Sequence, residues 1–260
     1  MFRRFFSSSR AVARGQDGWR AYVIGDVHGC LDLLNRLLSQ IAEDHALRGP
    51  GRGLIVLLGD LIDRGPNSAG VLKRLRQFDL PGFRLVGLAG NHEEVLLKIL
   101  GGDSTEVPGW LSFGGAETMQ SYGVDPKVLG ALSPAAAQRR IAATIPAEDR
   151  QFLEQFADSM QFGDYFLVHA GIRPGVPPDQ QTLRDLRWIR EPFLSDTRDH
   201  GPVVVHGHTI SEAVEEVGSR IGIDTGAYST GRLTALAIEG DKKWLIDTID
   251  GLRQLEPDVV

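Results

Sequence analysis

The fold is decided by three related segments, AYVIGDVHG (21–29), GLIVLLGDLIDRG (53–65) and FRLVGLAGNHE (83–93). Each begins as a short apolar run, which predicts a buried β-strand, and each ends in a glycine-containing loop. A helical pattern follows every loop, over residues 31–47, 68–78 and 92–100. A strand, a loop and a helix repeated three times predict a mostly parallel sheet with right-handed crossovers.

The segment from 101 to 163 interrupts this rhythm. It is first rich in glycine and aromatic residues and then shows helical patterns over 134–145 and 148–157, so we interpret it as a helical insertion, or cap. Later strand patterns have few helices between them, which predicts a mixed or antiparallel sheet; they cover 165–171, 203–209, 220–226, 233–240 and 243–249. The predicted fold class is α/β, with mixed central sheets flanked by helices.

The domain boundaries follow from these patterns. Residues 20–250 are predicted to form a single domain that contains the insertion, residues 1–19 a basic disordered tail, and residues 251–260 a C-terminal tail. The first 20 residues hold five arginines against Asp17 alone, a composition that also occurs in mitochondrial and chloroplast transit peptides. We favour a solvated tail on a cytoplasmic protein, and organelle targeting is the alternative.

Composition and charge exclude several classes of protein. The 260 residues are 42% hydrophobic and 24% charged, as in an average soluble globular chain. No apolar run is long enough to predict a membrane span. The net charge of −6 argues against nucleic-acid binding, which requires clustered lysines and arginines. The single cysteine, Cys30, excludes an internal disulfide and a cysteine-rich zinc site.

Oxygen and nitrogen donors gather in the loops that follow the predicted strands. In open α/β sheets, such loops build the binding site at the carboxyl ends of the strands. Donors of this kind without thiolates suit Mn, Fe or Zn, and a bridging carboxylate can hold two divalent ions about 3.5–4 Å apart. The donor residues in these loops are Asp26, His28, Asp60, Asp63, Asn91, His92, His169 and His208.

Each loop alone also has a structural interpretation. Asn91 could be an ordinary helix N-cap, and Asp63 with Arg64 an ordinary surface pair. In VHGHT, His206 and His208 lie two positions apart, so spacing alone does not choose between them. The joint pattern of five such loops, each after a strand, is what favours a metal site over these separate explanations.

The ordered set GDVHG, GDLIDRG, GNHE, HAG and GHT resembles the phosphoprotein phosphatase family of dinuclear metallophosphoesterases, above all its bacterial and lambda-phage-type serine/threonine branch. The resemblance spans roughly residues 20–240 and implies the metallophosphoesterase fold, in α/β/β/α layers. It implies that Asp26 and His28 bind the first metal and that Asp60 bridges the two metals. It also implies that Asn91, His169 and His208 bind the second metal.

The same resemblance implies roles for residues that do not bind metal. His92 would be the general acid for the leaving alkoxide, and Asp63 would orient it. Arg64 would bind the phosphate, and Arg190 of WIRE (188–191) is the best candidate for a second phosphate-binding arginine, with Arg173, Arg184 and Arg187 as rivals. The expected cofactor is a pair of divalent ions, in first place Mn²⁺, with Fe, Zn, Ni or Co as alternatives.

Three functions remain in view. The first is a serine/threonine protein phosphatase that uses a metal-bound hydroxide for direct attack on phosphorus, with a phosphorylated protein, a peptide or a small phosphate ester as partner. The second is a symmetrical bis(5'-nucleosyl)-tetraphosphatase, and the third a non-catalytic scaffold with the same fold. Tyrosine phosphatase activity is a further possibility that the sequence leaves open.

The insertion is expected to shape substrate choice, with Trp110, Phe113 and Tyr122 packing the cap. Asp224 is either a support of the site or a turn residue.

Overall fold

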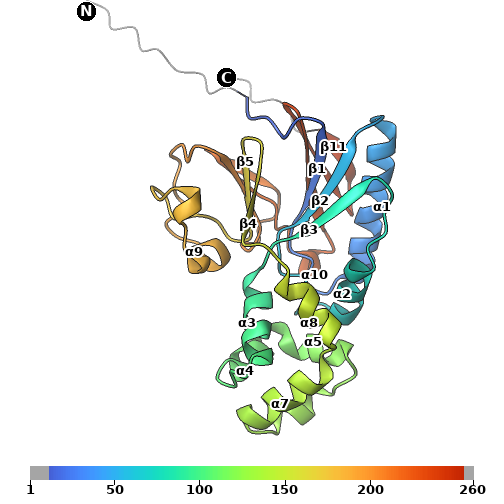
Figure 1. Cartoon of the computed structure of the whole chain (residues 1–260), viewed down its shortest axis with the longest axis vertical. Helices are drawn as coiled ribbons and strands as arrows, with labels where there is room; N and C mark the ends of the chain where they lie inside the picture. The colour runs from blue at the N-terminus through green and yellow to red at the C-terminus, as the bar shows by residue number, and fades with distance from the viewer. Residues whose placement is uncertain (1–11, 255–260) are drawn as a thin grey trace, which may run out of the picture.

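The computed structural model describes residues 12–254 and contains two mixed sheets packed face to face between layers of helices (Figure 1). The predicted α/β/β/α class is therefore confirmed. Residues 1–11 and 255–260 lie outside the described residues, and with them lies most of the predicted basic tail. No helix within the described range is long and apolar enough to cross a membrane.

The first sheet has six strands in the order β11-β10-β9-β1-β2-β3. Its three predicted strands are parallel neighbours, and the later strands add to it in antiparallel fashion. The strands are β1 (Trp19–Ile24), β2 (Arg52–Leu57), β3 (Phe83–Gly87), β9 (Thr234–Glu239), β10 (Lys242–Asp247) and β11 (Gly251–Gln254). The helices after the first three strands are α1 (Leu31–Leu47), α2 (Ser68–Arg76) and α3 (Asn91–Leu100).

The continuous apolar runs of β1 and β2 are explained by burial on both faces. Successive strand side chains point to opposite faces. Thus Tyr22 and Ile55 pack toward the helices, and Val23 and Val56 pack into the layer between the two sheets. Helix α1 covers the outer face with a stripe of buried residues at helical spacing, namely Leu34, Leu37, Leu38 and Ile41.

The second sheet has five strands in the order β4-β5-β6-β8-β7. They are β4 (Ser159–Phe162), β5 (Tyr165–Val168), β6 (Val203–His206), β7 (Glu215–Val217) and β8 (Arg220–Gly222). Its outer face packs against α9 (Leu183–Trp188), where Leu186 and Phe193 lie on Phe166 and Val204. Two short helices complete this part of the chain, η2 (Pro178–Gln180) and α10 (Ala227–Thr230).

The predicted insertion is helical and lies at one end of the two-sheet body (Figure 1). It contains α4 (Val107–Trp110), η1 (Leu111–Gly115), α5 (Ala116–Ser121), α6 (Pro126–Gly130), α7 (Pro134–Thr144) and α8 (Ala147–Glu154). It ends earlier than predicted, because residues 159–162 form β4 and pair with β5. Phe162 is fully buried between the sheets, which fixes this segment as a strand.

Both predicted tails are shorter than expected where the structure describes them. Gly251–Gln254 pair with Trp244–Asp247 as the edge strand β11, because the turn at Gly251 brings the chain back along β10. At the other end, the Gly15 backbone N–H donates to the carbonyl oxygen of Gly240 at 2.7 Å. The chain therefore packs on the domain before β1 begins.

Substitution of Phe162, which lies in the apolar layer between the two sheets, tests the fold. Phe162→Ala is expected to lower the free energy of unfolding by about 3 to 5 kcal/mol, because it leaves a cavity in that layer. Leu47→Ala is the control, since Leu47 is 88% exposed and its loss should change stability by about 0.5 kcal/mol or less. Urea unfolding followed by circular dichroism measures both. Equal effects would contradict the packing of Phe162 between the sheets.

Candidate metal centre

The predicted site residues follow β1, β2, β3, β5 and β6, except Arg190, which follows α9; Asn91 and His92 are the first two residues of α3. Within residues 12–254, five non-glycine residues have a positive φ, and all five are predicted site residues: His28, Asp60, Asp63, Arg64 and His208, at 44°, 49°, 73°, 65° and 63°. Such left-handed conformations cost roughly 1–3 kcal/mol each and persist where surrounding structure enforces them. The strain is therefore concentrated at one place, which is typical of a functional site.

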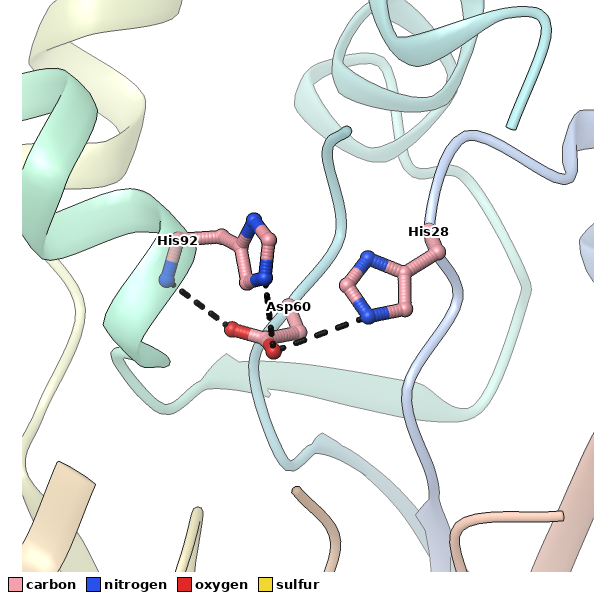
Figure 2. A group of neighbouring side chains, drawn as sticks. All are labelled: His28, Asp60 and His92. Atoms are coloured by element: carbon pink, nitrogen blue, oxygen red, sulfur yellow. Dashed lines mark hydrogen bonds and ion pairs between the residues drawn. The ribbon is translucent and has the colours of Figure 1, made fainter. Parts of the chain in front are cut away.

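The carboxylate of Asp60 lies at the middle of the site, between the rings of His28 and His92 (Figure 2). Its Oδ2 is 3.6 Å from Nε2 of His28 and 3.8 Å from Nε2 of His92. Its Oδ1 is 3.5 Å from Nε2 of His169 and accepts the backbone N–H of His92. All four side chains are buried. Asp60 therefore faces a different group of nitrogen donors with each of its two oxygens.

His169, Asn91 and His208 form the group on the Oδ1 side. The His169 Nε2 is 2.9 Å from Oδ1 of Asn91 and 3.2 Å from Nδ1 of His208. Burial lowers the pKa of His169, so its ring is neutral and carries one N–H. With that proton donated from Nδ1 to the Leu58 carbonyl at 2.9 Å, the Nε2 lone pair faces the Asn91 oxygen. Two such lone pairs repel each other unless a cation lies between them.

His28, on the Oδ2 side of Asp60, is also a neutral imidazole with a free nitrogen lone pair. Its Nδ1 donates to the carbonyl oxygen of Ile62 at 2.8 Å, and burial lowers its pKa to about 3. The ring is therefore neutral, and Nε2 has a free lone pair. Within the described part of the chain, this buried Nε2 has no hydrogen-bond partner. Neutral imidazoles and a carboxylate that converge in this way fit divalent cations such as Mn²⁺, Fe²⁺ or Zn²⁺.

Asp26 is placed differently from the other predicted ligands. It belongs to neither of the two donor groups that surround Asp60 among the described residues, which are His28, Asp60 and His92, and Asp60, His169 and His208. Its carboxylate instead accepts the backbone N–H of His208, at 3.1 Å to Oδ2. Burial, with the carboxylates of Asp224 and Asp60 nearby, raises its pKa well above the usual range. A divalent cation would relieve this repulsion, so Asp26 remains a proposed ligand.

Two glycines give the carboxylates their room. A Cβ added at Gly90 would lie 2.2 Å from Oδ1 of Asp60, and one at Gly207 would lie 2.0 Å from Oδ1 of Asp26. Both positions therefore exclude any larger residue.

Glu93, which the sequence interpretation left without a role, holds the loop that carries Asp60 in place. Its carboxylate accepts the backbone N–H groups of Asp60 and Leu61, each at 2.8 Å, and of Gly90 at 3.0 Å.

His92 and Asp63 form a close, buried side-chain pair. Nδ1 of His92 donates to Oδ2 of Asp63 at 2.6 Å. Burial works to lower the pKa of His92, but the carboxylates of Asp60 and Asp63 outweigh it and raise the pKa to about 9. The ring is thus an imidazolium at neutral pH. Trp110 and Thr118 of the insertion also hydrogen-bond Asp63, so the expectation that Trp110 only packs the cap is incomplete.

The two predicted phosphate-binding arginines lie near different histidines of the centre, Arg64 near His28 and Arg190 near His208. The Arg64 guanidinium lies 5.1 Å from the ring of Tyr228, which also packs against His28. Arg190 is exposed and lines an open groove of about 930 Å³ between α3 and α9. Its charge acts on His208, whose pKa is lowered to about 3 first by burial, then by His169, and further by Arg190.

Ion pairs separate Arg190 from two of its three rivals, Arg173 and Arg187. Arg173 pairs with Asp185 at 2.6 Å, and Arg187 is paired to two carboxylates, Glu94 and Asp158. The side chains of Arg184 and Arg190 form no ion pair with any residue from 12 to 254 and are free to meet an anion. His206, the other histidine of VHGHT, packs instead against Phe193, with ring centroids 5.1 Å apart.

Residues 20–237 match the calcineurin-like phosphoesterase family, so the chain belongs to that family. The resemblance drawn from the sequence motifs is thereby confirmed. The chain is 44% identical over 87 residues to the symmetrical bis(5'-nucleosyl)-tetraphosphatase of Serratia proteamaculans, a match that covers 34% of this chain and 28% of that one. It is 38% identical over 98 residues to serine/threonine-protein phosphatase 1 of Salmonella typhimurium, a match that covers 37% of this chain and 40% of that one.

These matches span less than half of either relative. Among solved structures, a cold-active protein tyrosine phosphatase superposes with a TM-score of 0.64 at 18% identity, covering 94% of this chain and 82% of that one. At that level of identity the likeness concerns the fold alone. The comparisons thus place the chain in the calcineurin-like phosphoesterase family, among relatives that are named for different phosphate substrates.

The different places of His206 and His208 predict different effects of the same substitution. His208→Gln is expected to weaken Mn²⁺ binding by on the order of ten-fold or more, because it removes an imidazole from the Oδ1 group. His206→Gln is the matched control and should keep the wild-type affinity, with melting temperatures recorded for both variants. Isothermal titration with MnCl₂ measures the affinity. Loss of binding in His206→Gln and not in His208→Gln would reverse the assignment.

Proposed function

We propose that this chain is a metal-dependent phosphomonoesterase that acts on phosphoserine or phosphothreonine in proteins or peptides. The observation that carries the proposal is the buried pair of His92 and Asp63, with Nδ1 of His92 2.6 Å from Asp63 and its Nε2 3.8 Å from Oδ2 of Asp60. A serine or threonine alkoxide is a poor leaving group and needs a proton as the ester bond breaks. A nucleoside diphosphate leaves without one, so a dedicated acid favours the protein ester.

The proposed step uses this chain's own side chains as follows. Arg64 and Arg190 bind the phosphate oxygens and stabilise their charge as the reaction proceeds. The oxygen of a water molecule forms a bond to phosphorus while the bond from phosphorus to the seryl oxygen breaks. His92 gives its Nε2 proton to that seryl oxygen, and Asp63 keeps the ring oriented throughout. The proton lost by the attacking water returns, through solvent, to His92.

The metal ions are part of the same proposal. We propose Mn²⁺ at both positions, held by Asp26, His28 and Asp60 on one side and by Asp60, Asn91, His169 and His208 on the other. When bound, such a pair lowers the pKa of a coordinated water and neutralises charge on the phosphate. The chain contributes the shared carboxylate and the neutral imidazoles described above.

The groove between α3 and α9 supports an extended substrate. It is lined by Arg190, by the 51% exposed Leu183 and by the 40% exposed Trp188, whose indole N–H donates to Glu94. Peptides bind in such grooves with apolar side chains in contact with aromatic and aliphatic residues. A phosphorylated residue at the metal centre would thus leave its flanking chain in the groove.

A second candidate is hydrolysis of a dinucleoside polyphosphate. The observation that favours it is the pair of free arginines in the groove, Arg184 and Arg190, which could meet further phosphates beyond the reacting one. The Serratia relative carries the name of that activity. The two candidates share the metal centre and differ in what the groove binds.

A comparison of the two substrates distinguishes the two candidate functions. With Mn²⁺, the wild-type chain is expected to hydrolyse a phosphoserine peptide with a kcat/KM on the order of ten-fold or more above that for diadenosine tetraphosphate, a difference of about 1.4 kcal/mol. Phosphate release is the readout for the peptide, and chromatography of the nucleotides for the dinucleotide. The opposite preference would establish the second candidate instead, and hydrolysis of neither, nor of p-nitrophenyl phosphate, would indicate a scaffold.

His92→Ala is the matching control for the mechanism. It should lower kcat on the phosphoserine peptide by roughly 10²–10⁴-fold, the usual contribution of a general acid. The bound metal, measured by elemental analysis, is expected to stay at the wild-type level. Wild-type turnover in this variant would refute the role of His92 even if the peptide proves to be the better substrate.

A further inference from the structure

The carboxylate of Asp63 is held by two side chains from the helical insertion. Nε1 of Trp110 donates to Oδ2 at 2.9 Å, the same oxygen that accepts from His92. Oγ1 of Thr118 donates to Oδ1 at 2.6 Å. Asp63 and Thr118 are fully buried, and Trp110 is 3% exposed. Both oxygens of the residue that orients His92 are thus bound by donors about 50 positions further along the chain.

The insertion is also shaped to dock at this point. Gly114 lies at φ +116°, and its carbonyl oxygen accepts the backbone N–H of Arg64 at 3.1 Å. A Cβ at Gly114 would lie 2.5 Å from that nitrogen, and one at Gly115 would lie 2.2 Å from the Trp110 ring. The turn between α4 and α5 therefore packs directly on the loop that carries Asp63 and on Trp110 itself, where no larger side chain fits.

The two donors restrict the freedom that Asp63 would otherwise have. An indole has a single N–H, which in a buried tryptophan normally finds an acceptor. Here that acceptor is the carboxylate beside the proton donor, rather than a backbone carbonyl. With an oxygen fixed on each side, the carboxylate cannot rotate about its Cβ–Cγ bond, so the 2.6 Å bond to Nδ1 keeps one direction. The Nε2 of His92 then keeps its direction toward the centre.

We propose that Trp110 and Thr118 are positioning residues for proton donation by His92, acting through Asp63. The inference rests on the proposed function for its kinetic consequence. Docking of the insertion is then required for the acid step itself, beyond any effect on substrate choice. Removal of either donor should slow reactions whose leaving group needs a proton and spare those whose leaving group does not.

Two conservative variants test this. Trp110→Phe keeps an aromatic ring and removes the N–H, and Thr118→Val keeps the shape and removes the hydroxyl. On the phosphoserine peptide, each should lower kcat by about ten-fold with KM within about two-fold. On p-nitrophenyl phosphate, whose leaving group is stable as an anion, kcat should change by less than about three-fold. Metal content should equal that of the wild type.

Tyr122→Phe is the matched control. It also removes a hydrogen bond of the insertion, from the Tyr122 hydroxyl to Asp149 at 2.7 Å, but this bond does not involve Asp63. It should affect both substrates equally or not at all. Equal losses on both substrates in Trp110→Phe and Thr118→Val, or losses no greater than in Tyr122→Phe, would overturn the inference.

A measurement without substrate separates this inference from the proposed function. The Nδ1 proton of His92, in its short bond to Asp63, should give a downfield proton resonance that is identified by its loss in His92→Ala. In Trp110→Phe and Thr118→Val this resonance is expected to move upfield or broaden, and in Tyr122→Phe to stay in place. An unchanged resonance in both variants would refute the positioning role, whichever phosphate ester the protein hydrolyses.

Discussion

The buried carboxylate of Asp60 is the constraint on which the rest of the site depends. It is 2% exposed, and imidazole nitrogens of three histidines lie within 3.5–3.8 Å of its oxygens. An isolated charge in such a place is costly, so buried charges are paired or bind metals. The position of this carboxylate is also fixed by the left-handed backbone conformation of Asp60 and by the hydrogen bond from its backbone N–H to Glu93.

The donor residues come together because of the order in which the strands pair in the two sheets, and not because of the local sequence of any one loop. Parallel pairing of β1, β2 and β3 places the loops after these strands at one edge. The second sheet, packed on the first through a shared apolar layer, brings the loops after β5 and β6 to the same edge. The site is therefore a property of two sheets held face to face. Its electrostatic cost is offset by the apolar layer that joins them.

Much of this was predictable from the sequence. The continuous apolar runs of β1 and β2, and the glycines after each strand, predict both the strands and the edge at which donors gather. The short strands β4, β7 and β11 were missed, because three or four residues such as Gly251–Gln254 carry too little periodicity to separate a strand from a loop or a tail.

Other features depend on contacts between distant parts of the chain and have no local signal. Spacing alone left His206 and His208 equivalent; the structure separates them, because the chain turns into a left-handed conformation at His208 while His206 faces Phe193. The position of Asp26 outside both donor groups was not foreseen. Trp110 was expected only to pack the cap, since a buried tryptophan in an aromatic segment is an ordinary core residue. Its bond to Asp63 follows from tertiary structure that spacing does not encode.

The central proposal is that the carboxylate of Asp60 would be shared by two divalent cations. Crystals grown with Mn²⁺ and measured at a wavelength with strong manganese anomalous scattering test it most directly. The account predicts two anomalous peaks per chain, about 3.5–4 Å apart, both beside the carboxylate of Asp60. A single peak, or peaks remote from Asp60 with His28 and His169 unchanged in position, would contradict it.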